Sequence, residues 1–449
     1  MNKGLDINIV CDEDLIFNRL RYTLDFINNH PLAKGKIFLY LNAPQKSSVN
    51  LYYSSKSDEK PWIPAQLNFF SNKKGVYEKL YANGYKQGEE VIFSVENKKK
   101  KEGIFYQEGK FGFDILETIF YHISRYEEVF WGNRFMDRHR RMKMQHQILP
   151  ANSLHHRPVV DILVKAFLLA LEIDVPDVPA QYSLTHDIDI IRKYNSVFKS
   201  AKSLVNAIRL GFGWRGFLKI ARSILRSTKD NTQDPYYTYS WLFDDRNKYR
   251  HKVVYFVTGG STRWDLYNKN YLKEMPSIIK MALAKSYNIG LHPSYKAFDD
   301  KKKLWQQYYR LKKILNRDIV YIRTHYLRLD IMETFKLFEE LGIRYDSTLG
   351  YADDIGFRCG TGFEYYPYNF AEERAWSFKE IPLVVMDSAL FYGVCGADVK
   401  CFKQKLDKFL RQNKYNTHIT FNFHNATFDD SVDFTRGLKE VYLTLLNSL

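Results

Sequence analysis

One histidine and two aspartates stand at the end of a short apolar run near the middle of the chain. The run is Tyr182-Ser-Leu-Thr-His-Asp-Ile-Asp189, so Asp187 and Asp189 are two positions apart. If the run is a buried strand, its polar end emerges at a sheet edge or barrel mouth, where two carboxylates can share one site. One could hold a metal ion while the other accepts a proton. An isolated Asp-x-Asp is also typical of a turn, so the interpretation depends on the rest of the chain.

Short apolar strands alternate with helix-like stretches after residue 180. We expect strands at residues 182–185, 252–257, 288–291, 319–323, 343–345, 380–385 and 418–423. We expect helices between most of them, at residues 271–285, 301–316, 331–341 and 397–413. Such alternation is typical of a parallel sheet, and seven units favour an α/β barrel or a doubly wound sheet.

The first 180 residues follow a different pattern. Strand-like runs at 36–41 and 91–94 are mixed with helical runs at 114–127 and 161–172. Two prolines in Val175-Pro-Asp-Val-Pro-Ala180 then indicate a linker. We therefore predict a smaller α+β domain of unknown role at residues 1–178. The α/β domain would follow at 179–449, with a basic helical insertion at about 191–250.

Polar side chains that could do chemistry follow several of the predicted strands. His292 follows the third strand, Arg323 and His325 follow the fourth, Asp387 follows the sixth, and His424 follows the seventh. In α/β barrels the C-terminal strand ends converge on one face, which holds the active site. An aspartate with two histidines is a common ligand set for a catalytic divalent metal. Each residue alone could instead be a hydrogen-bonded core or surface side chain, so their joint placement carries the prediction.

These motifs, in this order, resemble those of the polysaccharide deacetylases of carbohydrate esterase family 4, the NodB-homology fold. The resemblance implies a distorted seven-stranded (β/α) barrel. It also implies a hydrolase that removes acetyl groups from N- or O-acetylated sugars. The segments Phe120-Tyr-His-Ile-Ser-Arg-Tyr-Glu-Glu128 and Asp137-Arg-His-Arg140 extend the resemblance to a two-domain bacterial subfamily with an uncharacterised N-terminal domain.

The resemblance implies roles for the acid–base residues. Asp187 would be the general base, and Arg323 of the third motif would hold it in place. His424 matches the histidine of the last motif and would be the general acid. Asp387 stands where a carboxylate could tune His424.

The resemblance also implies a metal site, with one departure from the family pattern. Asp189 and His292 would be ligands, but the histidine usual four residues after the first is replaced by Lys296. His325 stands where proline is usual, and we predict that it replaces the missing ligand. The expected metal is divalent, with Zn²⁺ favoured. The alternative is a non-catalytic glycan-binding or assembly protein on a degraded deacetylase fold.

The positive charge of the chain is unevenly distributed. Lys and Arg number 67 against 51 Asp and Glu, a net charge of +16. Residues 197–228 resemble one or two basic amphipathic helices, broken near residues 211–216. They could lie on an anionic membrane surface, or pack on the barrel as a lid or side helix with a solvated basic face. The basic residues lack interleaved aromatic residues and a recognition motif, which argues against nucleic-acid binding.

The remaining features bear on location and substrate. The chain has no long uncharged apolar run, its first apolar run contains acids, and its four cysteines form no CxxC pair. We expect reduced thiols and a cytoplasmic protein, with peripheral contact to the inner membrane as an open alternative. The substrate would then be a nucleotide- or lipid-linked acetylated sugar. Aromatic residues at 363–376 could stack on sugar rings or belong to the core.

Overall fold

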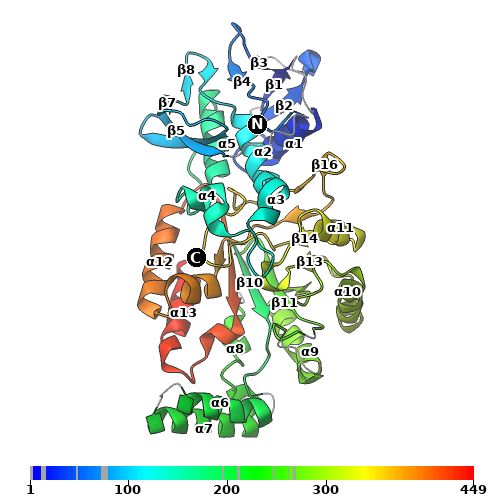
Figure 1. The fold of residues 1–449 in the computed structure, drawn as a ribbon, viewed down its shortest axis with the longest axis vertical. Coiled ribbons are helices and arrows are strands. Elements are labelled where there is room, and N and C mark those ends of the chain that lie inside the picture. Colours follow the sequence, from blue (N-terminus) through cyan, green and yellow to red (C-terminus); the bar gives the residue numbers. More distant parts are fainter. Residues whose placement is uncertain are drawn as a thin grey trace.

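The fold is that of a computed structural model, in which two regions lie end to end (Figure 1). The first region contains the N-terminal sheet and the second a larger parallel sheet; a pair of helices extends from the far end. The residues that the structure describes are 4–11, 17–46, 49–71, 79–194, 197–209, 213–244, 246, 248–260, 262–265 and 269–449.

An eight-stranded parallel sheet forms the centre of the C-terminal region. Its order is β17-β14-β13-β12-β11-β10-β19-β18. The strands are β10 (Gln181–Ile188), β11 (Lys252–Phe256), β12 (Asn288–Leu291), β13 (Tyr321–Ile322), β14 (Tyr345–Asp346), β17 (Lys379–Glu380), β18 (Val385–Met386) and β19 (His418–His424). Nearly every residue of β11 and β19 is buried, as is usual for parallel strands covered on both faces.

The two edge strands of this sheet are almost consecutive in the chain. Only residues 381–384 separate β17 from β18. In this link the amide of Ile381 donates to the carbonyl of Asp346, while that of Val384 donates to the carbonyl of Thr420. The sheet therefore curls round into a barrel-like form. The predicted parallel α/β sheet is confirmed, but the predicted strand at 380–385 is divided in two, so eight strands replace the seven expected.

Helices on the outside of the sheet occur where the sequence predicts them. They are α9 (Lys269–Ala284), α10 (Lys301–Leu315), α11 (Glu333–Glu340) and α12 (Val399–Gln412), joined by the unpredicted α13 (Leu438–Ser448). The side chains of Asp300 and Asp398 cap α10 and α12 by accepting from the amides of Lys303 and Cys401. These caps fix where the two helices begin relative to the strand ends.

The N-terminal region contains a six-stranded sheet of order β2-β1-β3-β4-β9-β8 and a three-stranded sheet of order β6-β5-β7. The first comprises β1 (Leu5–Val10), β2 (Ile37–Leu41), β3 (Val49–Ser54), β4 (Trp62–Pro64), β8 (Tyr106–Gln107) and β9 (Lys110–Phe111). The second comprises β5 (Tyr81–Gln87), β6 (Glu90–Glu96) and β7 (Gly103–Ile104). The parallel β1–α1–β2 unit, with α1 at Phe17–Asn29, differs from the α+β arrangement expected.

The helices of this region are α2 (Ile115–Ile123), α3 (Tyr126–Trp131), α4 (Ile148–Ala151) and α5 (Val159–Ala170). The single helix predicted at 114–127 is two helices, because Arg125 between them has a φ of 54°. The buried Arg125 and its partly buried partner Glu128 both contact Arg358 of the other region. Asp161 of α5 likewise accepts from the hydroxyl of Thr417 at 2.7 Å. The two regions thus share buried polar contacts, while the boundary at residue 178 stays a prediction.

A disulfide joins Cys395 to Cys401. The expectation of reduced thiols is wrong for this pair, whereas Cys11 and Cys359 are buried and form no disulfide within the described residues. Gly396 and Ala397 both have positive φ and turn the chain back, so that Cys395 faces the first turn of α12. Sequence spacing alone could not show this reversal.

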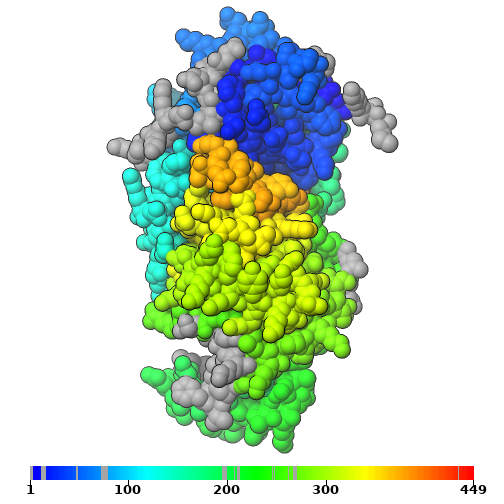
Figure 2. All heavy atoms as spheres, turned by 90° about the vertical axis from the view of Figure 1, so that its right-hand side faces the viewer, coloured from blue at the N-terminus to red at the C-terminus, as the bar shows by residue number. Residues whose placement is uncertain are grey.

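The predicted basic insertion forms a helical hairpin, α6 (Val197–Arg209) and α7 (Gly213–Lys229). It is followed by α8 (Tyr239–Leu242) and extends from the end of the molecule opposite the N-terminal region (Figure 1). Figure 2 shows the same hairpin as a green projection at one end of the molecule. In the part of the chain that the structure describes, no helix combines the length and apolar character needed to cross a membrane.

Candidate active site

A cavity of about 650 Å³ lies at the C-terminal ends of the parallel strands. It brings together five of the residues predicted from the sequence. These are Asp187, Asp189, His292, His325 and His424. Each lies within three residues of the C-terminal end of a strand of the sheet, and Asp187 pairs in register with His424 across β10 and β19. The strand-end convergence predicted from the sequence is therefore present.

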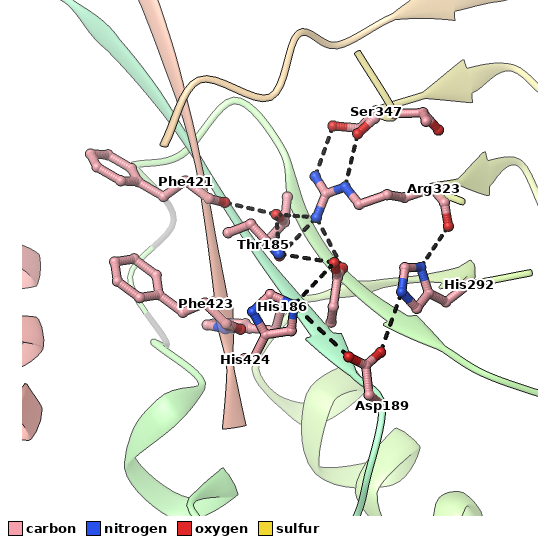
Figure 3. A network of polar contacts seen from close by, with 12 residues as sticks. Thr185, His186, Asp189, His292, Arg323, Ser347, Phe421, Phe423 and His424 are labelled. Atoms are coloured by element: carbon pink, nitrogen blue, oxygen red, sulfur yellow. Dashed lines mark hydrogen bonds and ion pairs between the residues drawn. The ribbon is translucent and has the colours of Figure 1, made fainter. Parts of the chain in front are cut away.

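Arg323 is the buried anchor of the site (Figure 3). Its Nη1 donates to Oδ1 of Asp187 at 3.0 Å, and its Nε donates to the carbonyl of Ser347 at 2.9 Å. Its guanidinium also lies over the ring of Tyr255, 4.5 Å from the centroid. The second oxygen of Asp187 accepts from Nδ2 of Asn422 at 2.9 Å. Arg323 does not line the cavity, so its contribution is to orient Asp187.

The carboxylate of Asp187 is held in its charged form. Burial alone raises the pKa of a carboxyl group, but the charges of Arg323, His292 and His424 lower the pKa of Asp187 below its ordinary value. One face of the carboxylate remains directed at the cavity, where Oδ2 lies 3.8 Å from Nε2 of His424. An ionised carboxylate with a free lone pair at a cavity wall can act as a proton acceptor.

His424 is fixed by the buried Asp387. Nδ1 of His424 lies 2.6 Å from Oδ1 of Asp387, and the backbone amide of His424 donates to Oδ2 at 2.8 Å. Burial lowers the pKa of His424, but the carboxylates of Asp387, Asp189 and Asp187 raise it to about 10. Nε2 therefore carries a proton and faces the cavity. Asp387 lies beside His424, as predicted, and does not itself line the cavity.

Asp189, His292 and His325 form a cluster whose possible ligand atoms all lie within 4.8 Å of one another. Oδ1 of Asp189 is 3.3 Å from Nε2 of His292, and Oδ2 is 3.6 Å from Nε2 of His325. Burial raises the pKa of Asp189, but the two histidines lower it well below its usual range. Burial lowers the pKa of His325, but Asp189 and Asp265 raise it to about 9.

The donor set of this cluster fits a divalent metal ion. Nδ1 of His292 is 2.6 Å from the carbonyl of Arg323 and donates to it, so Nε2 is the ring nitrogen that faces Asp189. Oδ1 of Asp189 is buried and has no hydrogen-bond partner. When the imidazole is neutral, a divalent cation can bind to both this nitrogen and the carboxylate oxygen. Two imidazoles and a carboxylate are the ligands that Zn²⁺ accepts in catalytic sites.

The positions of Lys296 and His325 agree with the prediction that His325 is the third ligand in place of residue 296. Lys296 is exposed and does not line the cavity, whereas His325 lies opposite Asp189. His186 also lies outside the site: its Nδ1 donates to the carbonyl of Phe423, and its ring packs near Tyr287. Alternation along β10 thus divides the opening motif, with both aspartates facing the cavity and the histidine facing the core.

Sequence reasoning missed a carboxylate behind the cluster, Asp265. Its Oδ1 lies 3.5 Å from Nδ1 of His325 and accepts from the amide of Tyr295 at 2.8 Å. Asp265 lies in the loop after β11, a strand to which the sequence assigned no chemistry. A carboxylate behind a ligating histidine orients the ring and raises its basicity.

Sequence reasoning also missed the contribution of the N-terminal region. Arg138, His139 and Arg141 line the cavity, although they precede the barrel by some forty residues of chain. Nδ1 of His139 is 2.9 Å from the hydroxyl of Tyr295, and Arg141 donates to the carbonyl of Tyr326 at 3.2 Å. The segment Asp137-Arg-His-Arg140 was recognised as a motif, but nothing in the sequence placed it at the strand ends.

The aromatic segment proposed for sugar stacking lies elsewhere. Phe363, Tyr365, Tyr368 and Trp376 are buried, and none lines the cavity. Phe363 and Tyr365 instead pack against His30 and Phe26 of the N-terminal region. Of the two interpretations given above, the core role is correct for these four residues, whereas Tyr366 is 47% exposed and does not line the cavity either.

Part of the chain, residues 8–176, matches a family of unknown function, DUF7033. No curated protein matches the chain in sequence. Several solved structures align with it, among them the following two. One is a candidate polysaccharide deacetylase from Mycobacterium smegmatis, at 13% identity and a TM-score of 0.35, covering 61% of this chain and 86% of that one. The other is a mutant of a CE4 family pseudoenzyme with restored activity, at 8% identity and a TM-score of 0.28, covering 62% and 69%. The function is therefore argued from the site itself.

Proposed function

We propose that the protein is a metal-dependent hydrolase that removes acetyl groups from an N- or O-acetylated sugar or polysaccharide precursor. One observation carries the proposal: an ionised Asp187 and a protonated His424 face one cavity, beside a cluster of two histidines and an aspartate. Hydrolysis of an amide or ester needs a proton acceptor for water and a proton donor for the leaving group, and these two residues supply both.

Asp189, His292 and His325 would hold the metal. A divalent ion in this position supplies Lewis-acid polarisation of the acetyl carbonyl. The carbonyl of Arg323 and the carboxylate of Asp265 keep the two imidazoles in orientation. These outer contacts reduce the reorganisation that ligand binding requires.

Asp187 accepts the proton of the attacking water. Arg323 and Asn422 hold its carboxylate at a fixed angle, and the positive charge of Arg323 keeps it ionised before the reaction. His424 then donates its Nε2 proton to the departing nitrogen or oxygen. Asp387 stabilises the protonated imidazole and prevents the ring from turning away. Acid and base of this kind each contribute about 10²–10⁴-fold to the rate.

The test is Asp187→Asn, which preserves the shape of the side chain and removes the proton acceptor. We expect the variant to bind one metal ion per chain, as the wild type does, and to hydrolyse a chromogenic acetyl ester or an N-acetylated oligosaccharide at least about 100-fold more slowly. Elemental analysis and acetate release measure the two properties separately. Near-normal hydrolysis by this variant would refute the base assignment. Absence of both metal and hydrolysis in the wild type would favour the glycan-binding alternative.

A further inference from the structure

The helical hairpin of α6 and α7 has an unusual surface. Between residues 197 and 229 there are eight Lys and Arg and no Asp or Glu, half of the net charge of +16. The three most exposed large apolar side chains of the described residues are also here: Ile208 and Trp214 at 70% and Leu225 at 62%. Basic and apolar groups on one exposed surface are typical of helices that lie at a membrane interface.

The two kinds of side chain are arranged on α7 in adjacent stripes. At 3.6 residues per turn, Trp214, Leu218 and Leu225 lie within about 40° of one another around the axis. A basic stripe follows directly beside them, formed by Lys229, Arg222, Arg215, Arg226 and Lys219 in angular order.

The orientation of α7 on the protein follows from its buried residues. Ile220 and Ser227 are buried, and the hydroxyl of Ser227 donates to Asp234 at 2.9 Å. Both lie about 120–140° around the helix from Trp214, on the side away from the basic stripe. The apolar stripe and the neighbouring bases therefore point outward.

The position of the hairpin relates it to the cavity. It is inserted between the C-terminal end of β10 and α8, on the end of the barrel that holds the site (Figures 1 and 2). Ile190, just before the hairpin, and Tyr236, just after it, both line the cavity. A surface that binds the hairpin is therefore brought to the same end of the molecule as Asp187 and His424.

We propose that α6 and α7 dock on an anionic phospholipid bilayer. Charge complementarity selects this occupant: the outward bases match lipid phosphates, and Trp214 suits the interfacial layer of a membrane. The saccharide of a lipid-anchored substrate would reach the cavity while its anchor stays in the bilayer. Together with the proposed function, on which this step rests, membrane docking specifies the substrate class as a membrane-anchored acetylated saccharide.

The experiment compares co-sedimentation of the full chain with vesicles of phosphatidylcholine alone and vesicles that also contain phosphatidylglycerol. The wild type is expected to bind the anionic vesicles at low salt and to lose binding as salt screens the charges. The variant R215Q/R222Q/K229Q is expected to bind roughly 100-fold more weakly, because each base near the surface contributes about tenfold or less. Trp214→Ala is expected to weaken binding without changing its salt dependence.

A matched control removes three charges elsewhere. Lys98, Lys99 and Lys101 are exposed in the loop of the N-terminal region, and K98Q/K99Q/K101Q is expected to bind as the wild type does. Equal loss in both triple variants, equal binding to neutral and anionic vesicles, or no binding at all would each overturn the proposal. Capture of RNA or an acidic protein in place of vesicles would do the same.

Activity separates this proposal from the proposed function. The hairpin variant is expected to hydrolyse a soluble acetyl ester normally and an acetylated glycolipid in anionic vesicles more slowly than the wild type. Equal rates on the vesicle substrate would overturn the membrane-anchored substrate class. If the wild type hydrolyses neither substrate, the proposed function fails, while vesicle binding still decides whether the hairpin docks.

Discussion

Asp387 contacts His424 through both of its carboxylate oxygens. One meets Nδ1 at 2.6 Å and the other accepts from the backbone amide at 2.8 Å, so neither the ring nor its carrier strand can turn without breaking a contact. Carboxylate and imidazole are thereby fixed as a unit, with Nε2 as the only ring nitrogen available to the cavity. This relation makes Asp387 a positioning residue for the proposed acid.

The first prediction concerns Asp387→Asn. The amide keeps the size of the side chain but loses the charge that stabilises protonated His424, so we expect kcat to fall by about 100-fold with metal content unchanged. Steady-state hydrolysis and elemental analysis measure the two effects. Asp407→Asn removes an exposed carboxylate that pairs with Lys403 and serves as the control. Loss of metal along with activity would show that Asp387 acts on the whole site.

The second prediction concerns the third metal ligand. His325→Ala is expected to lose most of its metal, because two ligands remain and the buried Asp189 keeps only one histidine partner. Lys296→Ala is the matched control, since this exposed residue stands four positions after His292 and does not line the cavity. Metal content by elemental analysis should fall in the first variant only. Full metal occupancy in His325→Ala would exclude His325 as the third metal ligand.

The third prediction concerns Asp265 behind His325. Asp265→Asn removes the charge that orients the imidazole, and we expect the dissociation constant of the metal to rise about 10–100-fold. Competition with a chelator measures this constant directly. Asp299→Asn, at an exposed carboxylate paired with Arg140, should leave it unchanged. An unchanged constant in both variants would show that Asp265 only holds the loop.

The site could be predicted in large part because its residues follow strands that the local pattern reveals. Parallel topology brings the C-terminal strand ends together, so the strand pattern alone places Asp187, His292 and His424 in one group. Asp265 follows a strand by several residues, and His139 comes from another region of the chain. Their placement depends on loop paths and on packing between regions, which a periodic pattern does not encode.

Two features of the fold were mispredicted for similar reasons. The strand expected at 380–385 changes partner midway, because Ile381 bonds toward β14 and Val384 toward β19. The Cys395–Cys401 disulfide depends on two consecutive residues with positive φ, one of which is Ala397. An alanine gives no signal for that backbone conformation.

The last prediction concerns the contact between the two regions. The side chain of Glu128 is 8% exposed and lies between Arg125 and Arg358, each of which donates to it through Nε at 2.9 Å. Burial raises the pKa of this carboxyl group, but the two guanidinium charges lower it from 4.5 to about 2. The ionised form therefore stabilises the fold. This stabilisation is complete above the ordinary pKa and is lost as pH falls from about 4.5 toward 2.

Glu128→Gln removes the counter-charge of the buried Arg358 and leaves the buried Arg125 paired with Glu127 alone, at 3.4 Å. We expect the free energy of unfolding at neutral pH to fall by about 3–5 kcal/mol, as when one partner of a buried ion pair is removed. Between about pH 4.5 and 2 the wild type should lose stability more steeply than the variant, by about 3 kcal/mol in total. Denaturant unfolding at several pH values measures both. Glu102→Gln, at an exposed pair with Lys86, should change stability by less than about 1 kcal/mol. If the free energy of unfolding of the wild type and of Glu128→Gln fell with the same slope below pH 4.5, Glu128 would not be the source of this pH dependence.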